Sequence, residues 1–346
     1  MEISAIGLDL AKYVFEVHGV DGSGRVVLRR QLRRGEVEKF FARLAPCVVG
    51  MEAGSAAHHW ARVLMRLGHE VRLMPAQYVR PYRKRHKNDA ADAAAICEAL
   101  GRPSMRFVAV KTAEQQAVLM QHRVRDQLVG QRTALINALR GHLAEFGIVA
   151  ARGRAALGRL RAVLAQADDS RVPALARGAL CELAGQLESV EARIGALEAA
   201  IVAWHRENEA SRRLATIPGI GPLAASAIVA TVGDASQFAT ARHFAAWIGL
   251  VPNQHSSGGK PRLGRITKAG DAYLRRNLIH GARAVLSWRR RRPPSPAAWL
   301  GALLARRHVN VVTVALANKN ARVAWALLRR GGTWRGDHQT SVAAPA

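Results

Sequence analysis

Four carboxylates in the first hundred residues occupy positions where α/β folds usually carry out chemistry. Asp9 closes an apolar stretch in Gly7-Leu8-Asp9, and Glu52 ends a second apolar run. Asp89 and Asp92 are three residues apart at the start of a predicted helix, which puts both on one face. Because strand ends and helix starts line the functional crevice of such sheets, these acids are candidates for one site.

Converging carboxylates repel one another unless cations neutralise them. Hard oxygen ligands suit Mg²⁺, and two such ions can clamp a scissile phosphate. Each acid also has an ordinary explanation, since Asp89 can cap its helix and an aspartate after a strand is common turn chemistry. Together, on a basic chain, the four acids predict a Mg²⁺ site that acts on a phosphodiester.

A second motif, Ile217-Pro218-Gly219-Ile220-Gly221-Pro222-Leu223, precedes a helical run over 224–232. It resembles the turn of a helix-hairpin-helix, in which backbone N–H groups at Gly219 and Gly221 and a helix N-terminus contact a DNA phosphate. The alternative is a plain joint between two helices, which uses glycine and proline equally well.

A third motif covers 252–265 and includes Ser256-Ser257-Gly258-Gly259. A serine in such a loop could attack a phosphodiester while nearby cations hold the developing charge. The resulting phosphoserine would conserve the bond energy for rejoining. The candidate cations are Lys260, Arg262, Arg265 and Lys268. The alternative is a flexible, solvated basic loop.

The sequence lacks the residues that several other chemistries require. His280-Gly281-Ala282-Arg283 matches the His-x-x-Arg box of tyrosine recombinases, but all four tyrosines precede it, whereas those enzymes need one downstream. The thirteen histidines and three cysteines show no metal-site spacing. No phosphate-binding loop of the ATPase type is present.

The elements that position these motifs follow from periodicity. Strands are predicted over 3–10, 13–18, 25–30, 47–51 and 69–74, and helices over 36–45, 56–67 and 89–100, which indicates an α/β layer with a mixed sheet. After 212, short helices broken by glycine, an exposed basic loop at 288–294 and a last helix over 311–329 are predicted.

Between about 112 and 205 the pattern is helical and contains a heptad seam. Apolar residues alternate at spacings of three and four, which favours a coiled coil and hence self-association, although packing within the chain's own domain permits the same stripe. The seam comprises Leu180, Leu183, Leu187, Val190, Ile194, Leu197, Ile201 and Trp204.

The composition indicates which kinds of partner the chain binds. The 346 residues include 52 Lys+Arg against 25 Asp+Glu, a net charge of +27, so nucleic acid is the leading partner and an anionic membrane surface a poor second. No run of 18 apolar residues and no signal peptide are visible, and the scattered cysteines fit a reducing compartment. We therefore expect a cytoplasmic, nucleoid-associated protein without a membrane partner.

With these motifs in order, the chain resembles the IS one-ten family of insertion-sequence transposases, the DEDD–serine type, over most of its length. The anchors are 7–12 (Gly-Leu-Asp-Leu-Ala-Lys), 51–53 (Met-Glu-Ala), 87–93 (Lys-Asn-Asp-Ala-Ala-Asp-Ala), 217–221 (Ile-Pro-Gly-Ile-Gly), and 249–252 (Gly-Leu-Val-Pro) leading to Ser257-Gly258 and 268–270 (Lys-Ala-Gly).

The resemblance implies an α/β N-terminal RuvC-like domain of the RNase H fold at 1–111. It further implies a coiled-coil segment at 112–210 and a mostly α C-terminal serine transposase domain at 211–332. The polar residues at 333–346 predict a disordered tail. It implies that Asp9, Glu52, Asp89 and Asp92 bind Mg²⁺ and that a serine before a glycine, matching Ser257, becomes joined to DNA.

The resemblance also implies partners. These are donor and target DNA, a structured guide (bridge) RNA, and a homo-oligomer, dimer or tetramer, in which domains of different protomers share an active site. The expected activity is site-specific DNA recombination through a covalent phosphoserine. Two alternatives stay open: a Holliday-junction endonuclease in which the carboxylates direct water, and an architectural nucleic-acid-binding protein on an inactive RuvC-like scaffold.

Overall fold

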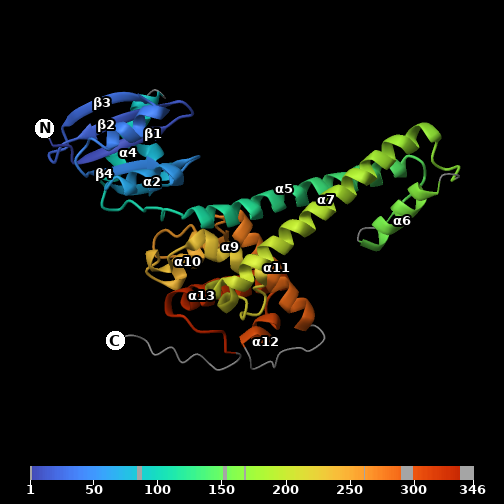
Figure 1. The fold of residues 1–346 in the computed structure, drawn as a ribbon. Helices are drawn as coiled ribbons and strands as arrows, with labels where there is room; N and C mark the ends of the chain where they lie inside the picture. Colours follow the sequence, from blue (N-terminus) through green and yellow to red (C-terminus); the bar gives the residue numbers. More distant parts are fainter. Residues whose placement is uncertain are drawn as a thin grey trace. The chain divides into compact units, whose positions relative to one another are not determined.

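A computed structural model describes residues 2–83, 88–150, 154–166, 169–260, 262–289 and 299–335 (Figure 1). The chain divides into two compact units. The first comprises Met1–Gln116 with Val232–Gln237, and the second comprises Ala117–Thr231 with Phe238–Ala346. The long helices and the C-terminal helices thus belong to one unit.

The first unit is built on a five-stranded mixed sheet, as predicted. Its strands are β1 (Ala5–Leu10), β2 (Val14–Val20), β3 (Val26–Arg33), β4 (Val48–Glu52) and β5 (Glu70–Met74). The order is β3-β2-β1-β4-β5, with β1, β2 and β3 antiparallel in sequence and β1, β4 and β5 parallel. The central strand β1 therefore joins the antiparallel and parallel halves.

Helices cover both faces of this sheet. Ile6 and Leu8 of β1 point to one face, where they join a core with residues of α1 (Val37–Phe41) and α2 (Ala57–Arg66). The alternate residues of β1 point to the opposite face, which α4 (Asp89–Leu100) covers. The short α3 (Ala76–Val79) precedes α4.

Gly7 sets the distance between β1 and α4. A Cβ at this position would meet the backbone of α4, with the Cys97 nitrogen only 2.5 Å away and the Ala93 carbonyl oxygen closer still. Only glycine lets the strand and the helix approach this closely. The glycine of the Gly7-Leu8-Asp9 motif therefore has a packing role that brings the start of α4 near the end of β1.

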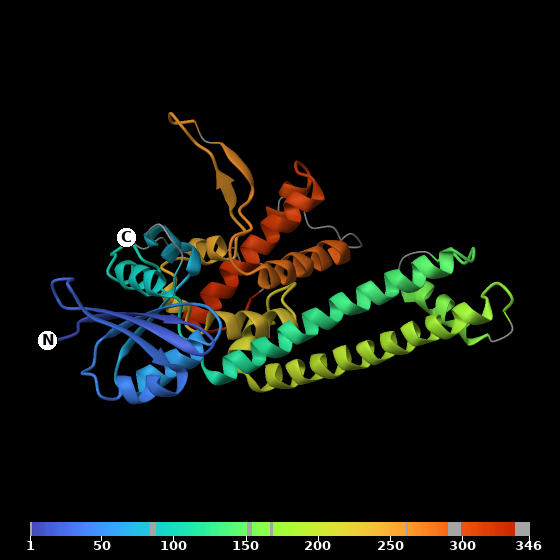
Figure 2. The same cartoon turned by 90° about the horizontal axis from the view of Figure 1, so that it is seen from above.

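Three helices form an extended arm of the second unit (Figures 1 and 2). They are α5 (Ala113–Ala144), α6 (Arg154–Ala165) and α7 (Ala174–Glu207). In both views α5 and α7 lie side by side over much of their length. Arg125 of α5 donates two hydrogen bonds to Glu198 of α7, at 2.8 and 2.5 Å, which ties the pair together.

The predicted heptad seam is largely buried within this one chain. Leu180 and Leu187 pack with Leu139 and Leu143 of α5 in a common core, and Ile201 is fully buried further along α7. The seam thus finds partners inside the protomer, as the alternative interpretation allowed. Self-association of the chain stays a prediction that the buried seam does not require.

The remaining helices surround the C-terminal motifs. They are α8 (Glu209–Leu214), α9 (Pro222–Val232), α10 (Ala241–Trp247), α11 (Ala272–Arg289), α12 (Trp299–Leu304) and α13 (Val309–Arg330). A two-stranded hairpin of β6 (Pro252–Gln254) and β7 (Leu263–Ile266) connects α10 to α11. None of the helices in the described ranges is both long and apolar enough to span a membrane.

The predicted loop at 288–294 and the predicted tail at 333–346 lie only partly within the described residues. The basic loop predicted at 288–294 is wrong at its start, because α11 continues to Arg289; residues 290–294 lie outside the described ranges. The predicted disordered tail begins with residues that the structure describes, and the backbone N–H of Trp334 donates to Thr216 Oγ1 at 2.8 Å. Residues 336–346 lie outside the described ranges.

His122 lies buried where α5 meets α9 and α11. Its Nε2 lies 3.0 Å from Ser226 Oγ and its Nδ1 2.9 Å from the Tyr273 hydroxyl. Because the Ser226 hydroxyl donates to the Pro222 carbonyl, at 2.7 Å, its oxygen accepts from Nε2–H, and Nδ1 accepts from the tyrosine. This network suits a neutral imidazole. Burial, and then the charge of Arg125, lowers the pKa of His122 to about 4.

This network predicts acid sensitivity of the helical unit. The unfolded chain binds a proton at His122 near pH 6.5, whereas the folded chain does so only near pH 4. Stability therefore falls as pH drops through this window, by about 3 kcal/mol in total. We expect denaturant unfolding at pH 7, 5.5 and 4.5 to show this loss in the wild type and a smaller one in His122→Gln. The same change at the exposed His243 is the control, and equal pH slopes in all three proteins would contradict the prediction.

Candidate functional site

Three of the four predicted carboxylates meet in the structure. One oxygen from each of Asp9, Asp89 and Asp92 lies within 4.8 Å of the others. Asp9 lies near the end of β1 and, like Gly7, is on the face that α4 covers, because strand side chains alternate between faces. Asp89 and Asp92 lie in the first turn of α4. The fold therefore brings together groups that are 80 residues apart in sequence.

Capping does not account for Asp89. The N-cap of α4 is Asn88, whose side-chain oxygen accepts a hydrogen bond from the Ala91 N–H at 2.7 Å. The ordinary explanation considered for Asp89 is therefore wrong, because the preceding asparagine already satisfies this helix end. The Asp89 carboxylate is exposed and contributes to the cluster, while Asp92 is buried beside it.

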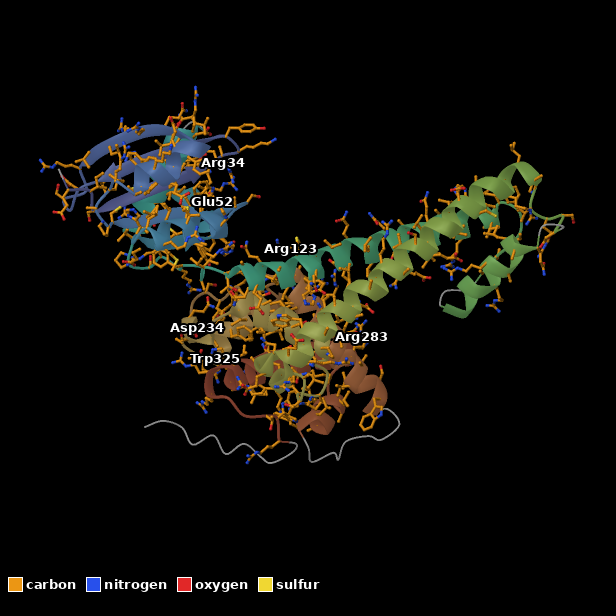
Figure 3. The ribbon with its side chains drawn as sticks, in the orientation of Figure 1. Arg34, Glu52, Arg123, Asp234, Arg283 and Trp325 are labelled. Carbon is orange, nitrogen blue, oxygen red and sulfur yellow. The ribbon has the colours of Figure 1, made fainter. Side chains whose placement is uncertain are left out.

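Glu52, the fourth predicted carboxylate, lies at the end of β4 (Figure 3). It ends β4, the parallel neighbour of β1, one residue beyond the paired Leu8 and Met51. Its carboxylate is not among those within 4.8 Å, but its charge raises the pKa of Asp9. The four predicted acids thus comprise a close group of three and one neighbour on the adjacent strand.

The electrostatics of the cluster favour a bound cation. Burial, followed by the charges of Asp92, Asp89 and Glu52, raises the pKa of Asp9 to about 6. Arg83 forms an ion pair with Asp92 and offsets part of the negative charge. Oxygen ligands this close together, still mutually repulsive beside one arginine, fit a divalent metal.

Ser257 lies at the tip of the β6–β7 hairpin, which projects from the helices of the second unit (Figure 2). Residues 257–260 form the turn: Lys260 N–H donates to the Ser257 carbonyl at 3.1 Å. Gly258 and Gly259 have φ values of 56° and 74°, and two positive values are what a type I′ hairpin turn requires. The motif is thus a built hairpin and not only a flexible loop.

The two neighbouring serines differ in their hydrogen bonds. The Ser256 hydroxyl oxygen accepts from the Arg262 N–H and from Gln254 Nε2, each at 3.0 Å, so it holds the two strands together. The Ser257 hydroxyl makes no hydrogen bond to any residue that the structure describes, and the side chain is exposed. Of the two, Ser257 is the hydroxyl that is available to a substrate.

The base of the hairpin is closely fixed. Gly249 and Gly270, from two of the anchor motifs, face each other across its two ends. A Cβ on Gly249 would lie 2.5 Å from the Ala269 nitrogen, and one on Gly270 would overlap the Trp247 carbonyl oxygen. Two side chains add to this attachment. Arg275 donates to the carbonyls of residues 248 and 269, at 2.9 and 2.8 Å, and Asn318 donates to that of residue 250, at 3.0 Å.

The predicted cations follow the same hairpin. Lys260 lies in the turn, Arg262 directly precedes β7, Arg265 lies in β7, and Lys268 follows that strand; all four are exposed. Lys268 also has a φ of 56°, an unusual value for a residue with a side chain. These four positions put positive charge along the hairpin that carries Ser257.

The 217–221 turn packs against other helices of the second unit. Gly219, with φ of 90°, packs against the backbone of α11, where an added Cβ would lie 2.8 Å from the Gly281 carbonyl oxygen. Asn320 of α13 donates to the Pro218 carbonyl at 2.9 Å. Gly221 has open space around its Cβ position. Of the two glycines, Gly221 is the better candidate for a phosphate contact.

Sequence analysis missed Arg83, Arg275 and Asn318. Nothing in their local sequence marks them, because their partners are 6 to 68 residues away. It also missed the hairpin, although Gly258-Gly259 between two extended segments is a recognised two-residue hairpin signal.

Two models of transposase families match regions of this chain. Residues 211–296 match the family described as "Transposase IS116/IS110/IS902 family", and residues 6–148 match the DEDD transposase family of IS110 elements. The first match contains the hairpin with Ser257, and the second contains all four carboxylates. Each motif therefore lies in a region that the family models cover.

Curated relatives cover nearly the whole chain. A "Probable family 20 transposase" of Pseudomonas aeruginosa is 55% identical over 97% of this chain and 99% of its own. The "Transposase for insertion sequence element IS1111A" of Coxiella burnetii is 44% identical over 96% and 92%. The corresponding IS1328 protein of Yersinia enterocolitica is 40% identical over 95% and 98%. The chain belongs to the IS116/IS110/IS902 family of transposases, enzymes that bind, cut and rejoin DNA.

Proposed function

We propose that this transposase is a site-specific recombinase that cuts DNA through a covalent phosphoserine at Ser257. The observation that carries the proposal is the Ser257 hydroxyl, which is exposed at the tip of a rigidly based hairpin and lacks a hydrogen-bond partner among the described residues. A carboxylate cluster on the same chain supplies the metal site that such chemistry uses.

The carboxylate cluster would hold Mg²⁺ through Asp9, Asp89 and Asp92, with Glu52 as a neighbouring ligand. A metal held there would supply charge stabilisation at the scissile phosphate. The sheet order β3-β2-β1-β4-β5, with its antiparallel and parallel halves, supports assignment of this unit to the RuvC-like type of the RNase H fold.

Ser257 then carries the covalent step. Its Oγ forms a bond to phosphorus while the bond between phosphorus and the 3′-oxygen breaks, and the serine proton ends on that leaving oxygen as a 3′-hydroxyl. In the second step the 3′-hydroxyl of a partner strand attacks the same phosphorus. The bond to Oγ breaks and the serine regains its proton, so the exchange needs no external energy source.

The cations of the hairpin would serve this step. Lys260, Arg262 and Arg265 lie beside the serine in sequence and are exposed, so they can contact the phosphate that is attacked. Guanidinium and ammonium groups stabilise the negative charge that develops there. In this scheme Lys268 and Gly221 would contact the DNA backbone. Gly219 is less accessible to DNA because it packs against Gly281.

The partners extend beyond DNA in this proposal. Self-association would bring hairpins and carboxylate clusters of different protomers together, and a structured guide RNA would select the target, at the nucleoid. Light scattering of the full chain, with and without the transcript of the element's own non-coding end, tests self-association and its dependence on that RNA. We expect a dimer or tetramer that the RNA promotes. A monomer under both conditions would contradict the oligomer.

Trapping the covalent species tests the central claim. The protein is mixed with a nicked suicide substrate made from its native flanking DNA, and a protein–DNA adduct that survives denaturation is expected with Mg²⁺ and not with EDTA. Cutting without an adduct would support an endonuclease, in which the carboxylates direct water at the phosphate. Binding without cutting would support the architectural alternative.

A further inference from the structure

The second unit contains a large groove away from the serine itself. It has a volume of about 1680 Å³ and lies between α13, α12, the base of the hairpin and residues 333–335. Three tryptophans, Trp299, Trp325 and Trp334, contribute to its lining, and we name it the tryptophan groove. Pockets for small molecules occupy about 300–1,000 Å³, so this volume suits a polymer segment better than a metabolite.

The charge of the groove identifies the chemistry of its occupant. Six cations contribute to the lining, and none of its described residues is acidic. The cations are Arg265, Lys268, Lys319, Arg322, Arg330 and Arg335. Two copies of the chain that met through this surface would bring like charges together. A polyanion instead finds a counter-charge along the whole groove.

The tryptophans indicate that this polyanion is unpaired. Trp299 is 44% exposed, which is high for an indole, and the Lys319 ammonium lies 4.6 Å from its ring centroid. Trp325 lies on α13 (Figure 3), and Trp334 is anchored through its backbone to Thr216. Aromatic rings within a basic groove bind single strands, because unstacked bases can lie on the rings while cations follow the phosphates. The bases of a duplex are stacked on one another and offer no such faces.

The position of the groove identifies the strand as DNA. Pro252 and Arg265, at the two ends of the hairpin strands, line it. Ser257 is five residues after Pro252, which is at most about 17 Å of extended chain, or about five nucleotide steps of one strand. A DNA strand engaged at Ser257 would therefore reach the groove within a few nucleotides.

We propose that the tryptophan groove binds the unpaired DNA that flanks the scissile phosphate and stacks a base on Trp299. The choice of DNA rests on the proposed function, whereas single-strand binding rests on the groove alone. Holding unpaired nucleotides next to the serine would keep the cut end in place until the partner strand arrives.

Fluorescence anisotropy with the full chain in EDTA tests the proposal without any cleavage step. The probes are a labelled thymidine oligonucleotide of about 12 nucleotides, its abasic counterpart, the matching duplex and the corresponding uridine RNA. Trp299→Ala is expected to weaken thymidine-strand binding about 10-fold or more and to leave abasic binding unchanged. Trp299→Tyr should retain most of the affinity.

Two controls separate stacking from charge. Trp288→Ala removes an indole that is 61% exposed on α11 and does not line the groove, so it should bind like the wild type. Arg322→Gln should weaken binding to the thymidine and abasic strands alike and reduce the salt dependence by about one charge. Photocrosslinking with bromodeoxyuridine should label peptides from 299–304 or 309–330.

Several results would overturn the inference. They are equal binding by Trp299→Ala and Trp288→Ala, a Trp299-dependent preference for RNA, and loss of an oligomer in Trp299→Ala without loss of DNA binding. Because these assays need neither metal nor Ser257 chemistry, an enzyme that forms the adduct but fails them keeps the proposed function and loses only this inference. Trp299-dependent binding of the single strand without a Ser257 adduct would keep this inference and contradict the proposed function.

Discussion

Ser257→Ala is expected to form no covalent adduct with the suicide substrate and to lose recombination by at least about 10⁴-fold, as removal of a catalytic nucleophile does elsewhere. The Ser257 side chain is exposed and makes no hydrogen bond among the described residues, so its removal should leave the fold unchanged. Thermal unfolding of the variant checks this, and gel analysis under denaturing conditions measures the adduct.

Ser256→Ala is the matched control because it removes a hydroxyl one residue away. This hydroxyl joins Gln254 and Arg262 across the hairpin, so its loss should loosen the tip. An exposed hydrogen bond contributes about 1 kcal/mol, and we expect a loss of activity of no more than about tenfold, with the adduct retained. An adduct that disappears in Ser256→Ala and persists in Ser257→Ala would assign the nucleophile to Ser256.

Asp9→Asn is expected to abolish DNA cleavage, with a loss of at least about 10²- to 10³-fold, because it removes a central charge from the metal site. The same change should not destabilise the metal-free protein. Asp9 is held near Asp89 and Asp92 against their repulsion, as its raised pKa of about 6 indicates, and a neutral amide relieves that repulsion.

Metal-dependent melting separates this explanation from simple misfolding. Mg²⁺ or Mn²⁺ should raise the melting temperature of the wild type, because a ligand that binds only the folded state stabilises it. Asp9→Asn should show little of that rise. Glu38→Gln, a loss of an exposed charge away from the cluster, should cut DNA and respond to metal like the wild type. Cleavage by Asp9→Asn at the wild-type rate would remove the metal site from the mechanism.

Local pattern predicted most of the elements. The helix over 89–100 agrees with α4 at both ends, and the five predicted strands each overlap one observed strand. These elements depend on neighbours a few residues away, through alternation, helical spacing and helix starts. The mixed character of the sheet also follows, because an early strand hairpin followed by strand–helix alternation leaves few alternatives.

The heptad seam is an example of what local pattern leaves open. Alternating spacings of three and four identify an apolar stripe and not the surface that covers it. In the folded chain Leu180 and Leu187 meet Leu139 and Leu143 from a helix some forty residues earlier. A second copy of α7 offers the same apolar chemistry, so only the path of the chain distinguishes the two solutions.

The glycines show the same ambiguity at single positions. Gly219 suits a phosphate-binding turn and equally suits close backbone packing, and its contact with Gly281 reveals the packing. Gly258-Gly259 suits a loose loop and equally suits a type I′ turn, and the flanking strands select the turn. The partner that decides the role of Gly219 is remote in sequence, whereas the strands that select the Gly258-Gly259 turn lie only a few residues away.

By itself, then, the sequence determined the elements, the basic surface and the identity of the chemical groups, because residue type and short-range spacing set these. It also determined that Asp89 and Asp92 share a helix face. The tertiary structure alone decided that Asp9 joins them, that Glu52 lies just outside the close group, and that Ser257 rather than Ser256 has a free hydroxyl among the described residues. The reason is physical: these facts depend on which surfaces pack together and which backbone groups pair across the chain, and residue spacing carries no record of such contacts.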